Sequence, residues 1–312
     1  MQLVLLFPGQ GSQAPGMARD LAAAFPAAAR ALEAVDDALS APLSRLMFDG
    51  PAEELTLTKN AQPALLAHGA AAWAALRDAA ASHVVAAAGH SLGEFTAYHA
   101  AGALTLGAGV RLVRRRGELM FHSGVDRPGA MAALLGDPAQ PIEEICEAAS
   151  REAGVVVPAN YNSPGQVVIS GELAGVERAM ALAKAAGVKR AVKLNVSGAF
   201  HSPLMAIALP GLDQALGDAA LAAPVFPVYA NVTAEPVTNA ATARTLLTRQ
   251  LTAPVRWTEV VRAIASDYPD ALYAEVGPGA VLAGLMKKCV PGAEVVPCGT
   301  AADVDALLTR LA

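Results

Sequence analysis

Residues 84–94 read Val-Val-Ala-Ala-Ala-Gly-His-Ser-Leu-Gly-Glu, and a helical pattern of small residues continues from there to Gly102. A run of small and β-branched residues ending in Gly-x-Ser-x-Gly predicts a strand, a sharp turn and a helix, the arrangement called a nucleophile elbow. Gly89 and Gly93 favour that turn because they carry no Cβ atom where the backbone folds back. Ser91 would then stand at a helix N-terminus, where free N–H groups stabilise developing negative charge.

The same residues admit a second interpretation. Ser91 and Glu94 also fit the S-x-x-E pattern of a capping box, which only starts a helix. The two interpretations are compatible, so Ser91 is a candidate nucleophile that the motif alone does not establish.

Composition limits the classes of protein that this chain can represent. With 312 residues it can bury a large core, as one large domain or two moderate ones. Hydrophobic residues reach 54%, but charged residues and histidines interrupt the longest apolar region before it reaches membrane-spanning length. Residues 1–8 lack a basic region and read as a first strand, so we expect neither a signal peptide nor a membrane helix. Three scattered cysteines without metal-ligand spacing indicate a reduced, cytoplasmic protein with no metal site.

The net charge of −5 argues against a broad nucleic-acid surface. An acidic partner would therefore have to dock on a local basic cluster, and each such cluster can equally be an ordinary solvated face. The candidate clusters are Arg111, Arg114 and Arg115; Lys189, Arg190 and Lys193; and Lys287 and Lys288.

A glycine-rich loop follows the first strand, predicted at residues 2–7, and leads into a helix predicted over residues 16–39. Gly9, Gly11 and Ala14 match the G-x-G-x-x-G/A pattern of dinucleotide sites, but that fingerprint needs a second strand ending in an acid about 20 residues on. The acids at that distance, Glu33 and Asp36, lie in a helical pattern. The loop fits another use better, because its exposed N–H groups could complete an oxyanion hole.

Arg116 lies in a helix predicted from Ala103 to Phe121. Val113, Arg116 and Met120 share its apolar side by their spacing, whereas the neighbouring charged residues share the opposite side. A guanidinium on an apolar face needs an anionic or carbonyl partner. That partner is either a ligand or an Asp or Glu of the chain in a structural ion pair.

The coarse pattern of elements predicts an α/β chain with an insertion. Residues 51–82 are helical with a break at 58–63, and the element order between about 127 and 196 is βαββαβ, the ferredoxin-like unit. Its predicted elements are a strand at 129–135, a helix at 142–153, strands at 155–161 and 166–170, a helix at 173–186 and a strand at 188–196. The remaining elements are a helix at 206–219, a strand at 225–230, a helix at 241–251, a strand at 273–276 and an αβα tail.

Any of six histidines could serve as the base for Ser91. His90 adjoins the serine and should point to another side, and His99 lies about 12 Å down the following helix at 1.5 Å per residue. His201 lies in a loop, where catalytic groups are common, although a histidine there can also simply satisfy loop hydrogen bonds. No Asp or Glu is marked as its partner.

Seven motifs now fall in the order seen in one family, and the chain resembles the malonyl-CoA:acyl carrier protein transacylases over nearly its full length. The motifs are Phe-Pro-Gly-Gln-Gly-Ser-Gln at 7–13, Gly-His-Ser-Leu-Gly-Glu at 89–94, Arg-Gly at 116–117, Asn-Ser-Pro-Gly-Gln at 162–166, Gly-Ala-Phe-His-Ser at 198–202, Gln250 with Pro-Val-Arg-Trp at 254–257, and Glu-Val-Gly-Pro-Gly at 275–279.

The resemblance implies an α/β-hydrolase-like core with a parallel sheet, over residues 1–126 and 198–312, and a ferredoxin-like inserted subdomain over 127–197. It also implies a role for each of the following residues: Ser91 as nucleophile, His201 as general base oriented by the Gln250 carbonyl, Gln10 and Leu92 as oxyanion-hole N–H donors, Arg116 as malonyl anchor, and Phe200 crowding an α-methyl branch. Phe200 can equally be a packing residue. His99 departs from the apolar residue expected there and receives no role.

The implied activity is transfer of malonyl from coenzyme A to the phosphopantetheine thiol of an acyl carrier protein through a malonyl-serine, in fatty-acid synthesis. A polyketide synthase or a malonate decarboxylase system are alternative settings. Two other classes stay open: a serine esterase or thioesterase, and a nucleotide-binding or carrier-binding module using the 9–14 loop. We expect a monomer with no cofactor, since the coenzyme A thioester is a substrate, and neither nucleic acid nor membrane as partner.

Overall fold

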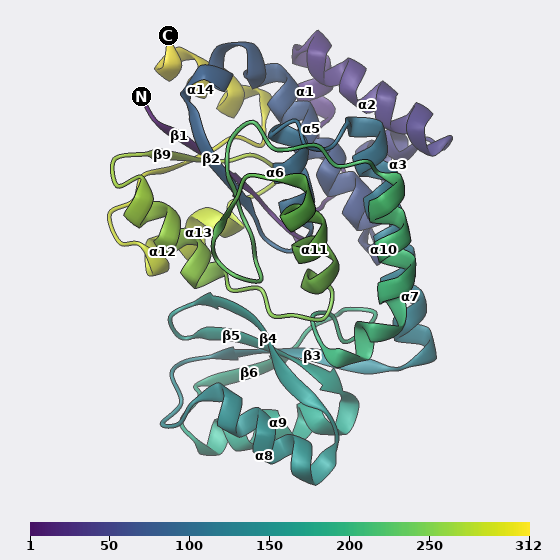
Figure 1. Cartoon of the computed structure of the whole chain (residues 1–312), viewed down its shortest axis with the longest axis vertical. Coiled ribbons are helices and arrows are strands. Elements are labelled where there is room, and N and C mark those ends of the chain that lie inside the picture. Colours follow the sequence, from purple (N-terminus) through teal and green to yellow (C-terminus); the bar gives the residue numbers. More distant parts are fainter.

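The computed structural model describes all 312 residues and contains two β-sheets, each with its own helices (Figure 1). The larger sheet has the strand order β10-β9-β1-β2-β7-β8 and is parallel except for the β7–β8 pair. Its strands are β1 Leu3–Phe7, β2 Val84–Gly89, β7 Val228–Tyr229, β8 Pro236–Val237, β9 Leu272–Glu275 and β10 Val295–Pro297.

Helices cover both faces of this sheet, as a parallel sheet with continuous apolar strands requires. In β1, Leu3, Leu5 and Phe7 join the larger core cluster on one face, and Val4 and Leu6 join a second cluster with α12 and α13 on the other. The helices of this unit are α1 Arg19–Ala24, α2 Pro26–Leu39, α3 Leu43–Asp49, α4 Ala52–Thr56, α5 Thr58–Ala80, α6 Leu92–Ala100, α7 Leu106–Asp126, α10 Leu209–Asp218, α11 Ala240–Gln250, α12 Trp257–Asp267, α13 Val281–Cys289 and α14 Ala301–Leu311, with 3-10 turns at Ala81–His83 and Pro203–Ala208.

Two predicted helices differ from the observed ones. The helix predicted over 16–39 is two helices, because Phe25 is extended before Pro26, which opens α2. The break predicted at 58–63 lies earlier, at Leu57, and Pro63 is buried inside α5. No helix is both long and apolar enough to cross a membrane.

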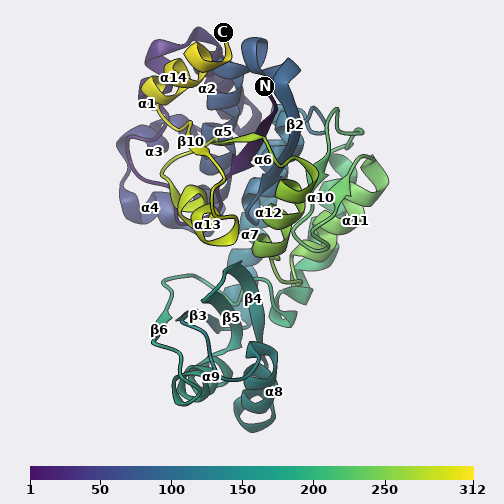
Figure 2. The ribbon, with the colours of Figure 1, turned by 90° about the vertical axis from the view of Figure 1, so that its left-hand side faces the viewer.

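The smaller sheet is antiparallel throughout, with the order β4-β5-β3-β6. Its helices α8 and α9 cover the face turned away from the larger unit (Figures 1 and 2). They enclose a separate core cluster that includes Ile145, Ile169 and Val176. The elements are β3 Gly129–Leu135, α8 Ile142–Ala153, β4 Val156–Ser163, β5 Gln166–Glu172, α9 Leu173–Ala185 and β6 Arg190–Lys193, in the predicted order.

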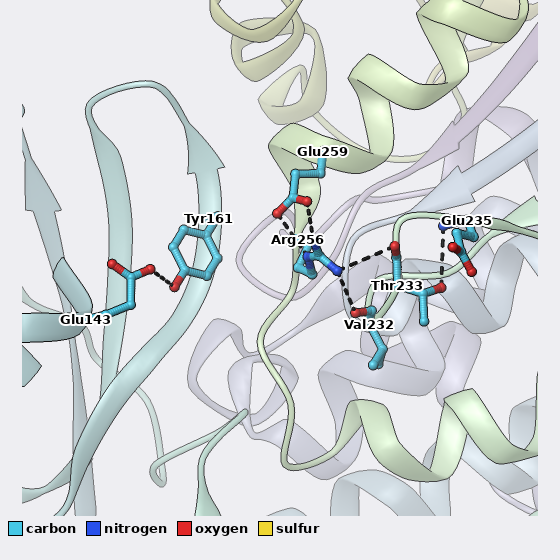
Figure 3. Close-up of polar contacts among 7 residues, drawn as sticks. All are labelled: Glu143, Tyr161, Val232, Thr233, Glu235, Arg256 and Glu259. Atoms are coloured by element: carbon cyan, nitrogen blue, oxygen red, sulfur yellow. Dashed lines mark hydrogen bonds and ion pairs between the residues drawn. The ribbon is translucent and has the colours of Figure 1, made fainter. Parts of the chain in front are cut away.

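The loop before α12 joins the two units through main-chain hydrogen bonds. Val255 donates to the Ala159 carbonyl at 2.8 Å and accepts from the Tyr161 N–H at 2.9 Å, which makes a parallel bridge to β4. Figure 3 shows the Tyr161 side chain on β4 directed toward Glu143, while Arg256 reaches back into the larger unit. The edge of the small sheet is therefore fixed beside the carboxyl ends of β1 and β2, where the site lies.

Candidate active site

Ser91 stands at a strained turn between β2 and α6, with φ 51° and ψ −104°. A Cβ on Gly89 would lie 1.9 Å from the Gly93 carbonyl carbon, and one on Gly93 would lie 2.0 Å from the Phe7 carbonyl oxygen. Neither contact is possible, so both glycines are required for this turn. A conformation of this kind persists only where the surroundings hold it.

The capping-box interpretation does not describe this turn. The Ser91 side chain makes no capping hydrogen bond, and the Glu94 carboxylate accepts instead from the Asn231 N–H and from the Gln250 side chain. The Ser91 hydroxyl is therefore available to other partners.

His201 is one of those partners. Its Nε2 lies 2.7 Å from Ser91 Oγ, and its Nδ1 lies 2.9 Å from the Gln250 carbonyl oxygen. A carbonyl can only accept, so Nδ1 carries the proton and Nε2 presents its lone pair to the serine hydroxyl. Burial, reinforced by the nearby charge of Arg116, lowers the pKa of His201 to about 3, so the imidazole is neutral and able to accept a proton at ordinary pH.

Arg116 projects from α7 into the same place and is 1% exposed. Its Nη1 donates to Gln62 Oε1 at 2.8 Å, and its Nη2 donates to Gln250 Oε1 at 2.9 Å and to Ser91 Oγ at 3.3 Å. Burial lowers the pKa of Arg116 to about 10, which leaves the guanidinium charged at neutral pH. All these partners are neutral, and no carboxylate forms an ion pair with Arg116. Arg116 therefore does not form a structural ion pair with an Asp or Glu of the chain.

A cavity of about 310 Å³ opens over these groups. The Gln10 N–H, in the loop after β1, donates to no protein acceptor. Leu92 is the first residue of α6, where N–H groups have no partner within the helix. Phe200 is 5% exposed and precedes His201 in the wall. The predicted site residues that line this cavity are Gln10, Ser91, Leu92, Arg116, Phe200 and His201.

The other histidines near the motif bind elsewhere. His90 Nε2 pairs with Asn162 Oδ1 at 2.8 Å, and His99 Nδ1 lies 3.0 Å from the Leu104 carbonyl oxygen, away from Ser91. Sequence reasoning missed two contributors, Gln62 and Asn231. Gln62 falls in the stretch predicted as a helix break, and Asn231 follows a two-residue strand and carries no motif, although it accepts the Ser91 N–H at 2.7 Å.

Comparison with known proteins gives the family. Residues 4–303 match the acyl transferase domain family. The chain is 43% identical to the malonyl CoA-acyl carrier protein transacylase of Bacillus subtilis over 287 residues, 92% of this chain and 90% of that protein. It is 42% identical to the Salmonella typhimurium protein of the same name over 309 residues, 99% of both.

Solved structures agree with that assignment. The acyl-carrier-protein S-malonyltransferase of Bartonella henselae superposes with a TM-score of 0.94 at 41% identity, covering 100% of this chain and 99% of that one. A malonyl-transacylase solved in complex with its type II PKS acyl-carrier protein superposes with a TM-score of 0.93 at 39% identity, covering 99% and 100%. The chain belongs to the acyl transferase domain family and, within it, to the malonyl CoA-acyl carrier protein transacylases.

Proposed function

We propose that this chain transfers a malonyl group from coenzyme A to the phosphopantetheine thiol of an acyl carrier protein, through a malonyl ester of Ser91. The names of its relatives support that activity. The main structural support for this activity is the position of Ser91 Oγ, which lies 2.7 Å from Nε2 of the neutral His201 and 3.3 Å from Nη2 of the buried Arg116. A nucleophile with a base on one side and a fixed cation on the other suits an acyl group that ends in a carboxylate.

In the first half-reaction, His201 Nε2 takes the Ser91 proton as Oγ attacks the thioester carbonyl carbon. The tetrahedral oxyanion accepts hydrogen bonds from the Gln10 and Leu92 N–H groups, and one such donor typically contributes about 3–4 kcal/mol. The carbon–sulfur bond then breaks, and coenzyme A leaves as a thiol with the proton from His201. The Gln250 carbonyl keeps the imidazole in the required tautomer, the task that a carboxylate performs in a triad.

The second half-reaction reverses these roles. The carrier thiol gives its proton to His201, and its sulfur attacks the ester carbonyl carbon. The bond between that carbon and Ser91 Oγ then breaks, Oγ takes the proton back from His201, and the malonyl group leaves as a thioester of the carrier. The exchange is ping-pong, because coenzyme A must leave before the carrier thiol can react.

Arg116 would set the selectivity for a diacid. A guanidinium and a carboxylate inside a pocket form a strong and directional pair. An acetyl group would leave the guanidinium without an anion, a penalty of about 1–3 kcal/mol or more. We assign Phe200 the task of crowding an α-methyl branch, since its ring lines the wall beside His201.

We also propose a division of the chain into an α/β-hydrolase-like core, residues 1–126 and 198–312, and a ferredoxin-like insertion, residues 127–197. The antiparallel order β4-β5-β3-β6 and the separate core of the insertion support this division. The three free buried cysteines are consistent with the reduced cytoplasm, where we place the protein as a monomer without a cofactor.

Fatty-acid synthesis is the pathway that we propose. The relative seen with a type II PKS carrier keeps a polyketide setting as the alternative. Transfer rates to several purified carrier proteins, measured side by side, decide between these settings.

Intact mass after mixing with malonyl-CoA tests the activity itself. We expect one malonyl adduct, absent from Ser91→Ala and lost again when a carrier protein is added, with malonyl appearing on the carrier. Release of free malonate without transfer would instead identify an esterase, which would share Ser91 and His201.

A further inference from the structure

We propose that Glu94 is a positioning residue of this site, which holds Gln250 and Asn231 so that Arg116, His201 and Ser91 stay aligned. Neither the elbow motif nor the two half-reactions require a buried acid at this position. The inference rests on the proposed function, because its effect is measured on malonyl transfer.

One carboxylate oxygen makes the connection. Glu94 is fully buried on α6, and its Oε2 accepts from Gln250 Nε2 at 2.7 Å and from the Asn231 backbone N–H at 3.1 Å. These two donors come from the end of α11 and from the loop after β7. Glu94 therefore ties two distant segments to the helix that begins directly after the nucleophile.

The contact with Gln250 fixes the orientation of an amide. Nε2 faces Glu94 and the Ser91 carbonyl, at 2.7 and 2.9 Å, and Oε1 consequently faces Arg116 Nη2. With the amide turned over, an NH₂ group would face the guanidinium and an oxygen would face the carboxylate. Oε2 already accepts the Asn231 N–H, so it is an acceptor toward Gln250 as well, and Glu94 selects the orientation in which Gln250 Oε1 can hold Arg116.

The contact with Asn231 reaches the elbow. Asn231 Oδ1 accepts the Ser91 N–H at 2.7 Å, and its Nδ2 donates to the Gly89 carbonyl at 2.7 Å, so this side chain spans both sides of the strained turn. Arg256 also holds this loop, because its backbone N–H donates to the Asn231 carbonyl at 3.0 Å. The Arg256 guanidinium also reaches the carbonyls of Val232 and Thr233 (Figure 3).

Glu94 acts on Arg116 through hydrogen bonds and not through a direct ion pair. The two side chains are linked through the Gln250 amide, and burial raises the pKa of the Glu94 carboxyl to about 7. A direct pair would use the guanidinium donors that the malonyl carboxylate needs. The intervening amide uses one Nη2 hydrogen, but it is neutral, and the Nε–H of Arg116 and the second Nη1 hydrogen make no hydrogen bond and can meet a substrate anion.

Two substitutions separate this role from simple support of the fold. Glu94→Gln keeps an oxygen that both donors can bind, whereas Glu94→Leu fills a similar volume and accepts no hydrogen bond. We expect E94L to lower kcat/KM for malonyl-CoA at least 100-fold and the ratio of malonyl to acetyl use at least 10-fold. We expect E94Q to stay within about 10-fold of the parent and to keep its selectivity.

The matched control is Glu275→Gln. Glu275 is another fully buried carboxylate, but it accepts from the N–H groups of Leu282 and Ala283 at the start of α13. E275Q should lower the melting temperature without changing the malonyl-to-acetyl ratio. If E94L does not fold, Glu94→Ser, whose side chain is too short to reach Gln250, takes its place.

A double substitution tests the route through Gln250. Gln250→Ala removes the amide but keeps the carbonyl that orients His201, so adding E94L to Q250A should cost much less selectivity than E94L costs alone. Equal selectivity in E94L and the parent, or equal losses in E94Q and E94L, would overturn the inference. Failure of the parent chain to form a malonyl adduct would instead overturn the proposed function.

Discussion

At the scale of single residues, the pKa of His201 decides when the base is available. Because burial lowers that pKa to about 3, the imidazole of the free enzyme stays neutral as the pH falls from 8 to 5. We expect kcat/KM for acylation by malonyl-CoA, measured by rapid quench, to show no loss attributable to this histidine over that range. Burial raises the pKa of Glu94 to about 7, so the profile is measured in E94Q as well. An acid limb near 6.5, the ordinary value for histidine, that persists in E94Q would contradict the environment described for His201.

The arginine gives a second prediction at this scale. Arg116→Ala should lower kcat/KM for malonyl-CoA by roughly 100-fold, about 3 kcal/mol, and change acetyl-CoA use far less, because it removes the carboxylate's partner. The control is Arg115→Ala, since Arg115 lies next to it on α7 but is exposed and pairs with Glu118. Equal losses for the two thioesters would exclude an anchoring role for Arg116.

Some parts of the site could be predicted from sequence and others could not, for a physical reason. The spacing of Arg116 with Val113 and Met120 placed it on the buried side of its helix, because local periodicity fixes which way a helical side chain faces. Glu94 and Asn231 act through contacts that span more than a hundred positions, from Glu94 to Gln250 and from Asn231 back to Ser91. No local pattern encodes such contacts, so the sequence around Glu94 indicated only a possible helix cap.

At the scale of elements, the elbow depends on two glycines. Gly93→Ala would place a Cβ 2.0 Å from the Phe7 carbonyl oxygen, which forces β1 and α6 apart. We expect the free energy of unfolding, measured in urea, to fall by more than about 3 kcal/mol. Gly284→Ala is the control, because an added Cβ there meets no atom within 4 Å and α13 should gain about 0.5–1 kcal/mol. Similar stability in both variants would mean that the turn is looser than described.

The same scale shows how far patterns predict elements. All six elements between Gly129 and Lys193 appear in the predicted order, because short strands and amphipathic helices alternate there with clear turns. The helix predicted over 16–39 was wrong at Phe25, where the proline that follows excludes a helical conformation. The strand predicted at 225–230 shrinks to Val228–Tyr229, since only those two residues pair with β2. Pairing partners decide strand length, and sequence alone does not supply them.

At the scale of the whole molecule, buried histidines make stability depend on pH. The pKa of His68 falls to about 4 through burial, so the unfolded chain binds more protons than the folded one between pH 4 and 6.5. Stability from this group is therefore lost as the pH falls through that window. We expect the free energy of unfolding of the parent to fall between pH 7 and pH 5 by about 2 kcal/mol more than that of His68→Gln. Urea unfolding at both pH values measures this difference.

His122→Gln, at an exposed position on α7, is the control. Its free energy of unfolding should change between the two pH values by the same amount as that of the parent. Identical pH slopes for the parent and H68Q would show that His68 does not contribute to acid sensitivity.

The bridge between Val255 and β4 has a practical consequence for protein engineering. Exchanging residues 127–197 for the corresponding segment of a relative would replace one wall of the cavity while leaving Ser91, Arg116 and His201 on the recipient. The grafted segment would pack correctly only if its backbone could still pair with Val255. The two main-chain hydrogen bonds of Val255 with β4 set the position of the small sheet relative to the rest of the chain. Chimeras that shift this register by one residue should mispack the cavity wall even when every side chain named in the chemistry is kept.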